Sequence, residues 1–166
     1  MQVKHLLTFT VITLSLGFST LLAKDNIYAN VPSSLIQPTD GRWKASVKSN
    51  DTKGCPIMMK SMLSKESLPS KSKAMVFNTP FDPSTLFDKS KDLKWESVGI
   101  NKWKAVMIQA KGAVNMSITW KLAINAKNKM AVHSLIKIDL PKELTAMLGG
   151  SGQCTVNTLG DFNLIK

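Results

Sequence analysis

The sequence predicts a mainly β (α+β) domain: an antiparallel, strongly curled sheet or small β-barrel with two short helices. Apolar and polar residues alternate with a period of two in several segments, which is the pattern of half-buried strands. Clusters of Gly, Asn, Asp and Ser separate these segments and indicate short turns. Two cysteines lie beside the first and the last strand-like segments, so a bond between them would join the ends of the sheet.

The first strand is expected at residues 40–48, where Trp43, Ala45 and Val47 share one face. Residues 50–54 are expected to form the turn that ends it. Two short helices are expected at 82–89 and 141–148. Further strands are expected at 74–78, in a hairpin of 93–98 and 102–109, and at 153–159, where the tail can extend the last strand.

The clearest element is a long hairpin of residues 113–124 and 130–140. Alternating residues of each arm are apolar, and Ser134 shares the apolar face of the second arm. His133 points to the opposite face, so Ser134 cannot serve as a nucleophile activated by that histidine.

The N-terminus carries a cation, an apolar run and a small residue, which together are typical of a secretory signal peptide. We expect residues 1–23 to be that signal, with cleavage after Ala23 or, alternatively, after Ala29. An uncleaved membrane anchor is the competing interpretation. A lead-in segment at 24–39 then precedes a single β-rich domain at 40–166, and the expected location is periplasmic or secreted.

Cys55 and Cys154 are expected to form a disulfide, because exported proteins meet an oxidising compartment. The spacing is not that of a CxxC zinc or redox pair, and no histidine is near either cysteine. A barrel or a half-barrel would use this bond to connect its first and last strands, and a β-sandwich could use it across two layers.

The chain is basic, with 22 Lys and Arg residues against 11 Asp and Glu residues. Arg42 is the one arginine, whereas nucleic-acid readers usually rely on arginine for two-point contacts with phosphate and guanine. We therefore expect no nucleic-acid partner. Scattered lysines favour an anionic envelope surface or lipid headgroups, and they also serve simply to keep a β-protein soluble.

Gly41-Arg42-Trp43 resembles the Gly-x-Trp motif that opens the first strand of the lipocalin superfamily. The chain is also similar to small uncharacterised bacterial periplasmic proteins with Gly-x-Trp near the start and Gly-x-Cys, here Gly152-Gln153-Cys154, near the end. The lipocalin resemblance implies a barrel whose tryptophan closes the bottom beneath a ligand cavity. The sequence departs from that family in having no long C-terminal helix and no second signature turn.

The sequence contains no constellation typical of catalysis, so we expect no enzyme and no catalytic residue. We also expect no cofactor and no metal site, although Met58, Met59 and Met62 are soft sulfur donors of the kind that bind Cu(I).

The expected function is that of an exported binding protein for an apolar or amphiphilic ligand or for an anionic envelope surface. Such a ligand would be an apolar or anionic lipid, and the protein would contact a membrane peripherally. The alternative is a protein–protein interaction domain without a small-molecule ligand. The expected ligand-binding residues are Trp43, Trp95, Trp103 and Trp120.

Overall fold

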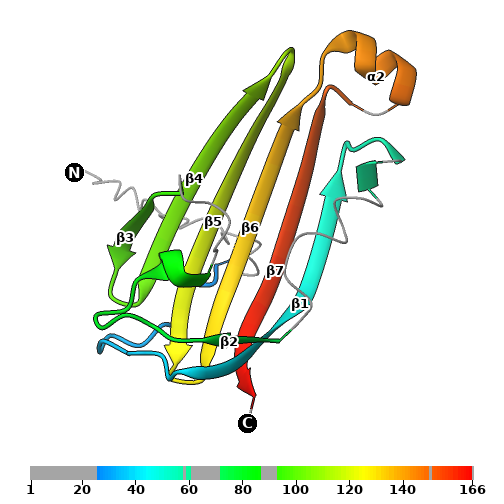
Figure 1. The fold of residues 1–166 in the computed structure, drawn as a ribbon. Coiled ribbons are helices and arrows are strands. Elements are labelled where there is room, and N and C mark those ends of the chain that lie inside the picture. Colours follow the sequence, from blue (N-terminus) through cyan, green and yellow to red (C-terminus); the bar gives the residue numbers. More distant parts are fainter. Residues whose placement is uncertain (1–25, 58, 61–71, 87–92, 150, 166) are drawn as a thin grey trace, which may run out of the picture.

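Seven strands form one antiparallel sheet in the computed structural model, which describes residues 26–57, 59–60, 72–86, 93–149 and 151–165. The sheet is strongly curled and makes a half-barrel (Figure 1). Its strands, in chain order, are β1 (Gly41–Lys53), β2 (Lys73–Met75), β3 (Trp95–Gly99), β4 (Lys102–Lys111), β5 (Val114–Ala126), β6 (Lys129–Asp139) and β7 (Gln153–Ile165). A 3-10 turn, η1 (Pro83–Leu86), and a helix, α2 (Lys142–Leu148), complete the described elements.

The strand order is β2-β1-β7-β6-β5-β4-β3, so the first long strand lies beside the last one. The strands β4, β5 and β6 follow each other as hairpins with tight turns, and the β5–β6 hairpin is the one that the alternation predicts. The short strands β2 and β3 form the two edges, and the sheet therefore curls without closing into a barrel (Figure 1).

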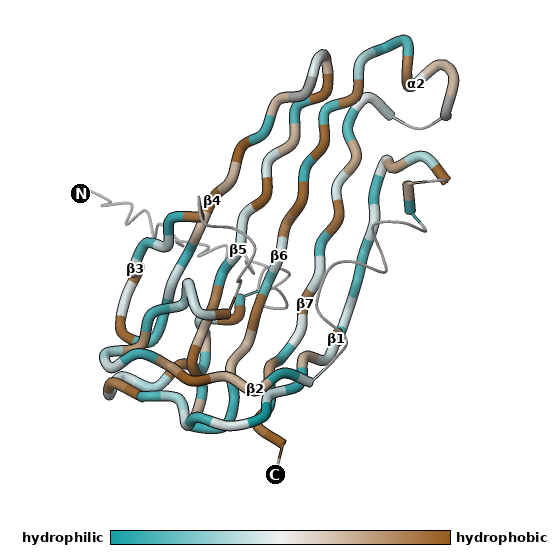
Figure 2. The backbone as a smooth tube through the Cα atoms, viewed as in Figure 1, coloured by the Kyte–Doolittle hydropathy of each residue, from teal (hydrophilic) through white to brown (hydrophobic). Residues whose placement is uncertain are grey.

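The inner face of the curled sheet carries the apolar core (Figure 2 shows the alternation of hydropathy along the strands). Trp43 and Leu122 are fully buried there, and Phe162 is almost so. The chain around β2 and η1 folds over this face and places Phe77 and Phe81 in a row of edge-to-face rings from Trp43 to Trp103. The lower end of the half-barrel is therefore filled by the protein's own side chains.

A disulfide joins Cys55, just after β1, to Cys154 in β7, which confirms the pairing expected from the sequence. Both cysteines are buried beside Ile138 and Val156. Gly54 precedes the bond with φ +68°, and a Cβ there would lie 2.2 Å from the carbonyl oxygen of Gln153. Only glycine tolerates both the positive φ and the lack of space for a Cβ atom at this position.

Three elements differ from the sequence-based expectation by more than two residues at a boundary. The turn expected at 50–54 is wrong for most of its length, because β1 continues to Lys53 through a bulge between Val47 and Ser49 and stays paired with β7. The strand expected at 74–78 ends at Met75, and the backbone N–H of Phe77 donates instead to Asp40 Oδ1 at 2.9 Å. The helix expected at 82–89 is a 3-10 turn over Pro83–Leu86, and residues 87–89 lie outside the described residues.

From residue 26 onward the lead-in segment packs against the fold, and Asn101 in the β3–β4 turn makes three of the hydrogen bonds that hold it. Asn101 is 1% exposed and has φ 60°. Its Oδ1 accepts from the N–H of Ile36, and its Nδ2 donates to the carbonyl oxygens of Pro32 and Ser34. These bonds hold the segment against the sheet.

The expected signal peptide at 1–23 lies outside the described residues. Among the residues that are described, no helix is long and apolar enough to cross a membrane.

Candidate functional site

The outer face of the sheet is polar and lysine-rich. Strand alternation places on it every second residue of β1, β4, β5, β6 and β7, opposite the core positions. The lysines on this face are Lys44, Lys48, Lys53, Lys102, Lys104, Lys121, Lys129 and Lys137. The acidic residues on it are Asp51, Glu96, Asp139 and Asp161.

Cations and exposed aliphatic side chains occur together on the β4–β5 part of this face. Lys104 lies directly opposite Lys121 in the ladder, a like-charge pair that destabilises a sheet unless an anion compensates it. Glu96 of β3 lies on the other side of Lys104. Val106 is 47% exposed and Ile108 is 76% exposed on the same face of β4. We call Lys102, Lys104, Lys121, Val106 and Ile108 the lysine–aliphatic patch.

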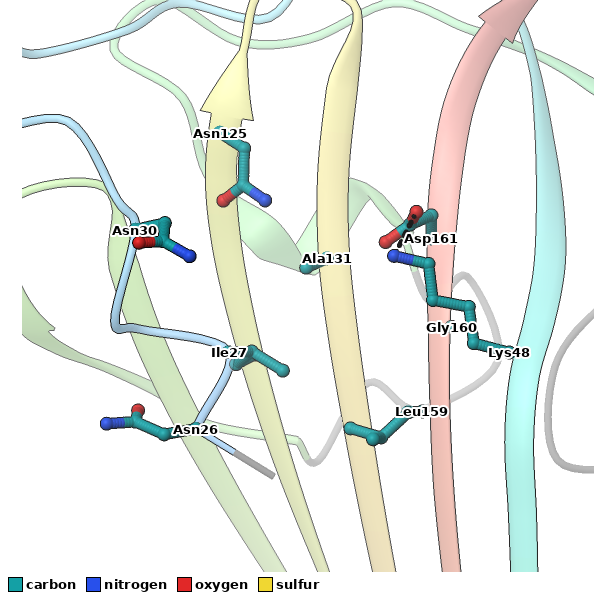
Figure 3. A pocket seen from close by; sticks show the side chains of 9 residues that line it. All are labelled: Asn26, Ile27, Asn30, Lys48, Asn125, Ala131, Leu159, Gly160 and Asp161. Atoms are coloured by element: carbon teal, nitrogen blue, oxygen red, sulfur yellow. Dashed lines mark ion pairs between the residues drawn. The ribbon is translucent and has the colours of Figure 1, made fainter. Parts of the chain in front are cut away.

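A pocket of about 200 Å³ opens elsewhere on the outer face, between the lead-in segment and the strands (Figure 3). Asn26, Ile27 and Asn30 cover it, and Ala131 and Asp161 lie on the sheet below them. The full lining is Asn26, Ile27, Asn30, Lys48, Asn125, Ala131, Leu159, Gly160 and Asp161. We call this cavity the Asp161 pocket.

Asp161 supplies the charge of this pocket, and its side chain is only 6% exposed. Its Oδ2 pairs with Lys48 Nζ at 2.7 Å and lies 3.7 Å from Lys129 Nζ. Its Oδ1 is buried and has no hydrogen-bond partner among the described residues, and the same holds for Oδ1 of Asn125. Buried acceptors of this kind cost free energy unless a donor meets them.

A second hollow, of about 180 Å³, lies further along the outer face and is lined by Asp51, Lys53, Leu135, Thr155 and Asn157. Beside it, His133 Nε2 lies 2.6 Å from Asn157 Oδ1, and the histidine is buried. Ser134 is on the inner face, as the alternation of β6 predicts. The structure thus separates the two residues that a hydrolytic site would need to bring together.

The structure brings three of the four tryptophans expected to bind a ligand into one cluster. Trp43, Trp95 and Trp103 lie in or against the core at the lower end of the half-barrel, and Trp43 Nε1 donates to the carbonyl oxygen of Thr39 at 3.0 Å. Trp120 lies on the inner face opposite Ala105 and Ser134. Neither of the two pockets described above is lined by a tryptophan, and the ligand-binding role of these residues stays a prediction.

Tyr28 connects the lead-in segment to the patch. Its hydroxyl donates to the carbonyl oxygen of Trp103, and Lys102 Nζ lies 5.9 Å from the centre of its ring. Burial raises the pKa of Tyr28 to about 12, against the opposing effect of a hydrogen bond with the backbone of Leu122. The neutral side chain of Tyr28 therefore packs the lead-in segment against the outer face.

Within the described part of the chain, no group of three or more His, Cys, Asp or Glu residues is placed to hold a metal ion. Met59 packs against the disulfide cluster, and Met58 and Met62 lie outside the described residues.

The chain matches no protein-family model, no curated protein and no solved structure at a significant level. The site is therefore interpreted from its own geometry. Sequence reasoning missed Asp161 because it lies in a tail that carried no motif, and it missed Asn125 because Asn in a turn is usually exposed.

Proposed function

We propose that the protein is an exported binding protein that docks peripherally on an anionic lipid surface through the lysine–aliphatic patch. The observation that carries this proposal is the coexistence, on one open sheet face, of a cross-strand lysine pair and exposed aliphatic side chains. Lysines near a membrane are attracted by anionic headgroups, and aliphatic side chains gain free energy when they enter the interfacial region.

The arrangement of the inner face supports surface binding over an enclosed apolar ligand. The row of rings from Trp43 through Phe77 and Phe81 to Trp103 occupies the lower end of the half-barrel. The apolar side chains that stay exposed to a ligand include Val106 and Ile108, which lie on the outer face of the sheet. An amphiphilic layer can contact both these side chains and the lysines beside them.

Vesicle flotation tests the charge component. The double variant Lys104→Gln/Lys121→Gln should bind vesicles of mixed neutral and anionic phospholipid about 30-fold more weakly, since each lysine near such a surface contributes about 1 kcal/mol. The control variant Lys53→Gln/Lys142→Gln has the same net charge but changes exposed lysines outside the patch, and it should bind nearly as well as the wild type.

The aliphatic component is tested by Ile108→Ser against Val76→Ser, because both side chains are 76% exposed and only Ile108 belongs to the patch. Weaker flotation of Ile108→Ser alone supports the proposal. An equal loss of flotation in the patch and control variants would contradict the proposal. Wild-type binding to purely neutral vesicles that equals its binding to anionic vesicles would also contradict it. If no patch variant affects flotation, the exposed strand is better explained as a protein–protein contact.

A further inference from the structure

The second half of β4 is an edge of the sheet. Among the described residues, β3 pairs with β4 only as far as Ala105, where Trp95 lies opposite, whereas β4 continues along β5 to Lys111. Figure 1 shows this length of β4 projecting beyond β3. No described strand or backbone hydrogen bond meets residues 106–111 on the side away from β5. A free strand edge of this kind is a template for pairing with another chain.

The direction of the backbone groups along this edge follows from the ladder between β4 and β5. The N–H of Ile124 donates to the carbonyl oxygen of Asn101 at 3.0 Å, and these two residues are opposite each other when the register is continued by one position. In an antiparallel ladder, successive residues direct their N–H and C=O groups alternately to the two sides. The odd-numbered residues of β4 therefore bond to β5, and Val106, Ile108 and Ala110 direct their groups to the free edge.

This edge has neither a charge nor an irregularity to protect it. Residues 106–110 are uncharged, and their register with β5 runs without a bulge. The side chains of Val106 and Ile108 are exposed beside the open backbone groups, and both residue types favour strands.

The edge at β1 is protected. Within the described residues, β2 pairs with β1 only at Gly41–Trp43, and the rest of β1 carries Lys44, Lys48 and Lys53 together with a bulge after Val47. Lysines and bulges are common devices that prevent an edge from pairing with another chain. A β4 edge is therefore not expected to pair with the β1 edge of another copy, and pairing between two β4 edges closes as a dimer and not as a fibre.

A strand that fits the β4 edge must be extended, uncharged over five positions and free to offer its own N–H and C=O groups. Residues 106–110 of a second copy meet all three conditions. We infer that two copies of this chain pair antiparallel through their β4 edges, with Ile108 opposite Ile108 of the second copy.

This register uses every outward-facing residue of the edge. It places Val106 opposite Ala110 of the second copy, and each copy then donates one N–H group from each of its three outward-facing residues. It also places Met107 opposite Gln109, so no like charges face each other. The two-fold axis leaves both outer faces on the same side of one continuous sheet, which joins two lysine–aliphatic patches. The pairing itself needs no lipid and goes beyond the proposed function.

Sedimentation of the oxidised protein without lipid tests the dimer. The wild type should change from one chain to two as its concentration rises. Ile108→Lys places two lysines opposite each other at the axis and should abolish the dimer. Val76→Lys adds the same charge at an equally exposed position outside β4 and should leave the dimer intact.

A charge exchange tests the register. Ile108→Glu alone should also be monomeric, because two carboxylates then lie opposite each other. An equal mixture of Ile108→Lys and Ile108→Glu should recover the dimer, since opposite charges meet at the axis. Both substitutions change an exposed side chain, so the core of each copy stays as it is.

Amide hydrogen exchange reports the backbone pairing directly. The amides of Met107 and Gln109 are bonded to β5 in a single copy, whereas those of Val106, Ile108 and Ala110 are open. Dimerisation should slow exchange at the three even-numbered positions and leave the two odd-numbered ones nearly unchanged.

Three results would overturn the inference. The first is a wild type that stays a single chain at every concentration, and the second is a dimer that forms equally well in Ile108→Lys. The third is a mixture of the two charged variants that stays monomeric, which would exclude the register centred on Ile108. All three are measured without lipid, so they leave the flotation test of the lysine–aliphatic patch to be judged by itself.

Discussion

Replacing both Cys55 and Cys154 by serine removes the covalent link between the end of β1 and the start of β7. The two residues are 99 positions apart. In the chain-entropy model, a loop of about 100 residues stabilises the fold by about 4.7 kcal/mol, because the crosslink restricts the unfolded chain. This is an upper figure, since residual structure in the unfolded chain already removes part of that entropy.

Urea unfolding followed by tryptophan fluorescence measures the effect. With an m-value of about 2 kcal/mol per molar urea, the oxidised wild type should unfold at a midpoint up to about 2 M higher than the double serine variant. Wild-type protein under dithiothreitol is the control that separates loss of the bond from burial of two hydroxyl groups. A midpoint shift of only about 0.3 M, with unchanged m-value, would refute the reasoning, because β1 and β7 would then be held by their ladder alone.

Two further predictions concern the lead-in segment. Asn101→Ala should lower the free energy of unfolding by about 3 kcal/mol, since it removes three hydrogen bonds of about 1 kcal/mol each. The urea midpoint of this variant is compared with that of Asn128→Ala, which changes an exposed turn residue. Equal midpoints for the two variants would show that Asn101 does not anchor the segment. Tyr28 is the one tyrosine of the chain, so tyrosinate absorbance reports the ionisation of this residue alone. The midpoint of its titration should be near pH 12 in the folded protein and near pH 10 in denaturant. Because the folded form holds this proton more tightly, the stability that Tyr28 contributes is complete below pH 10 and is lost between pH 10 and 12, and a midpoint near pH 10 in the folded protein would contradict its burial.

The sequence was sufficient to predict the strands whose two faces differ strongly in polarity. β5 and β6 follow from alternation, because slipping either strand by one residue would expose its whole apolar face. The continuation of β1 could not be read, since a bulge after Val47 shifts the alternation and leaves polar residues where apolar ones are expected. The pairing of β1 with β7 was accessible only through the cysteines, because backbone hydrogen bonds leave no trace in residue type.

The outer face could not be predicted in the same way, because polar residues there satisfy the pattern whether or not they bind anything. Asp161 occupies an ordinary outer-face position of β7 and Lys48 lies at the bulge of β1, so nothing in their spacing shows that the lead-in segment lies over the carboxylate. That segment is in turn held by Asn101, a turn residue more than 60 positions away. If this arrangement buries the carboxylate, Asn101→Ala should speed amide hydrogen exchange in residues 26–36 and at Asp161, whereas unchanged exchange would show that the segment is held without Asn101.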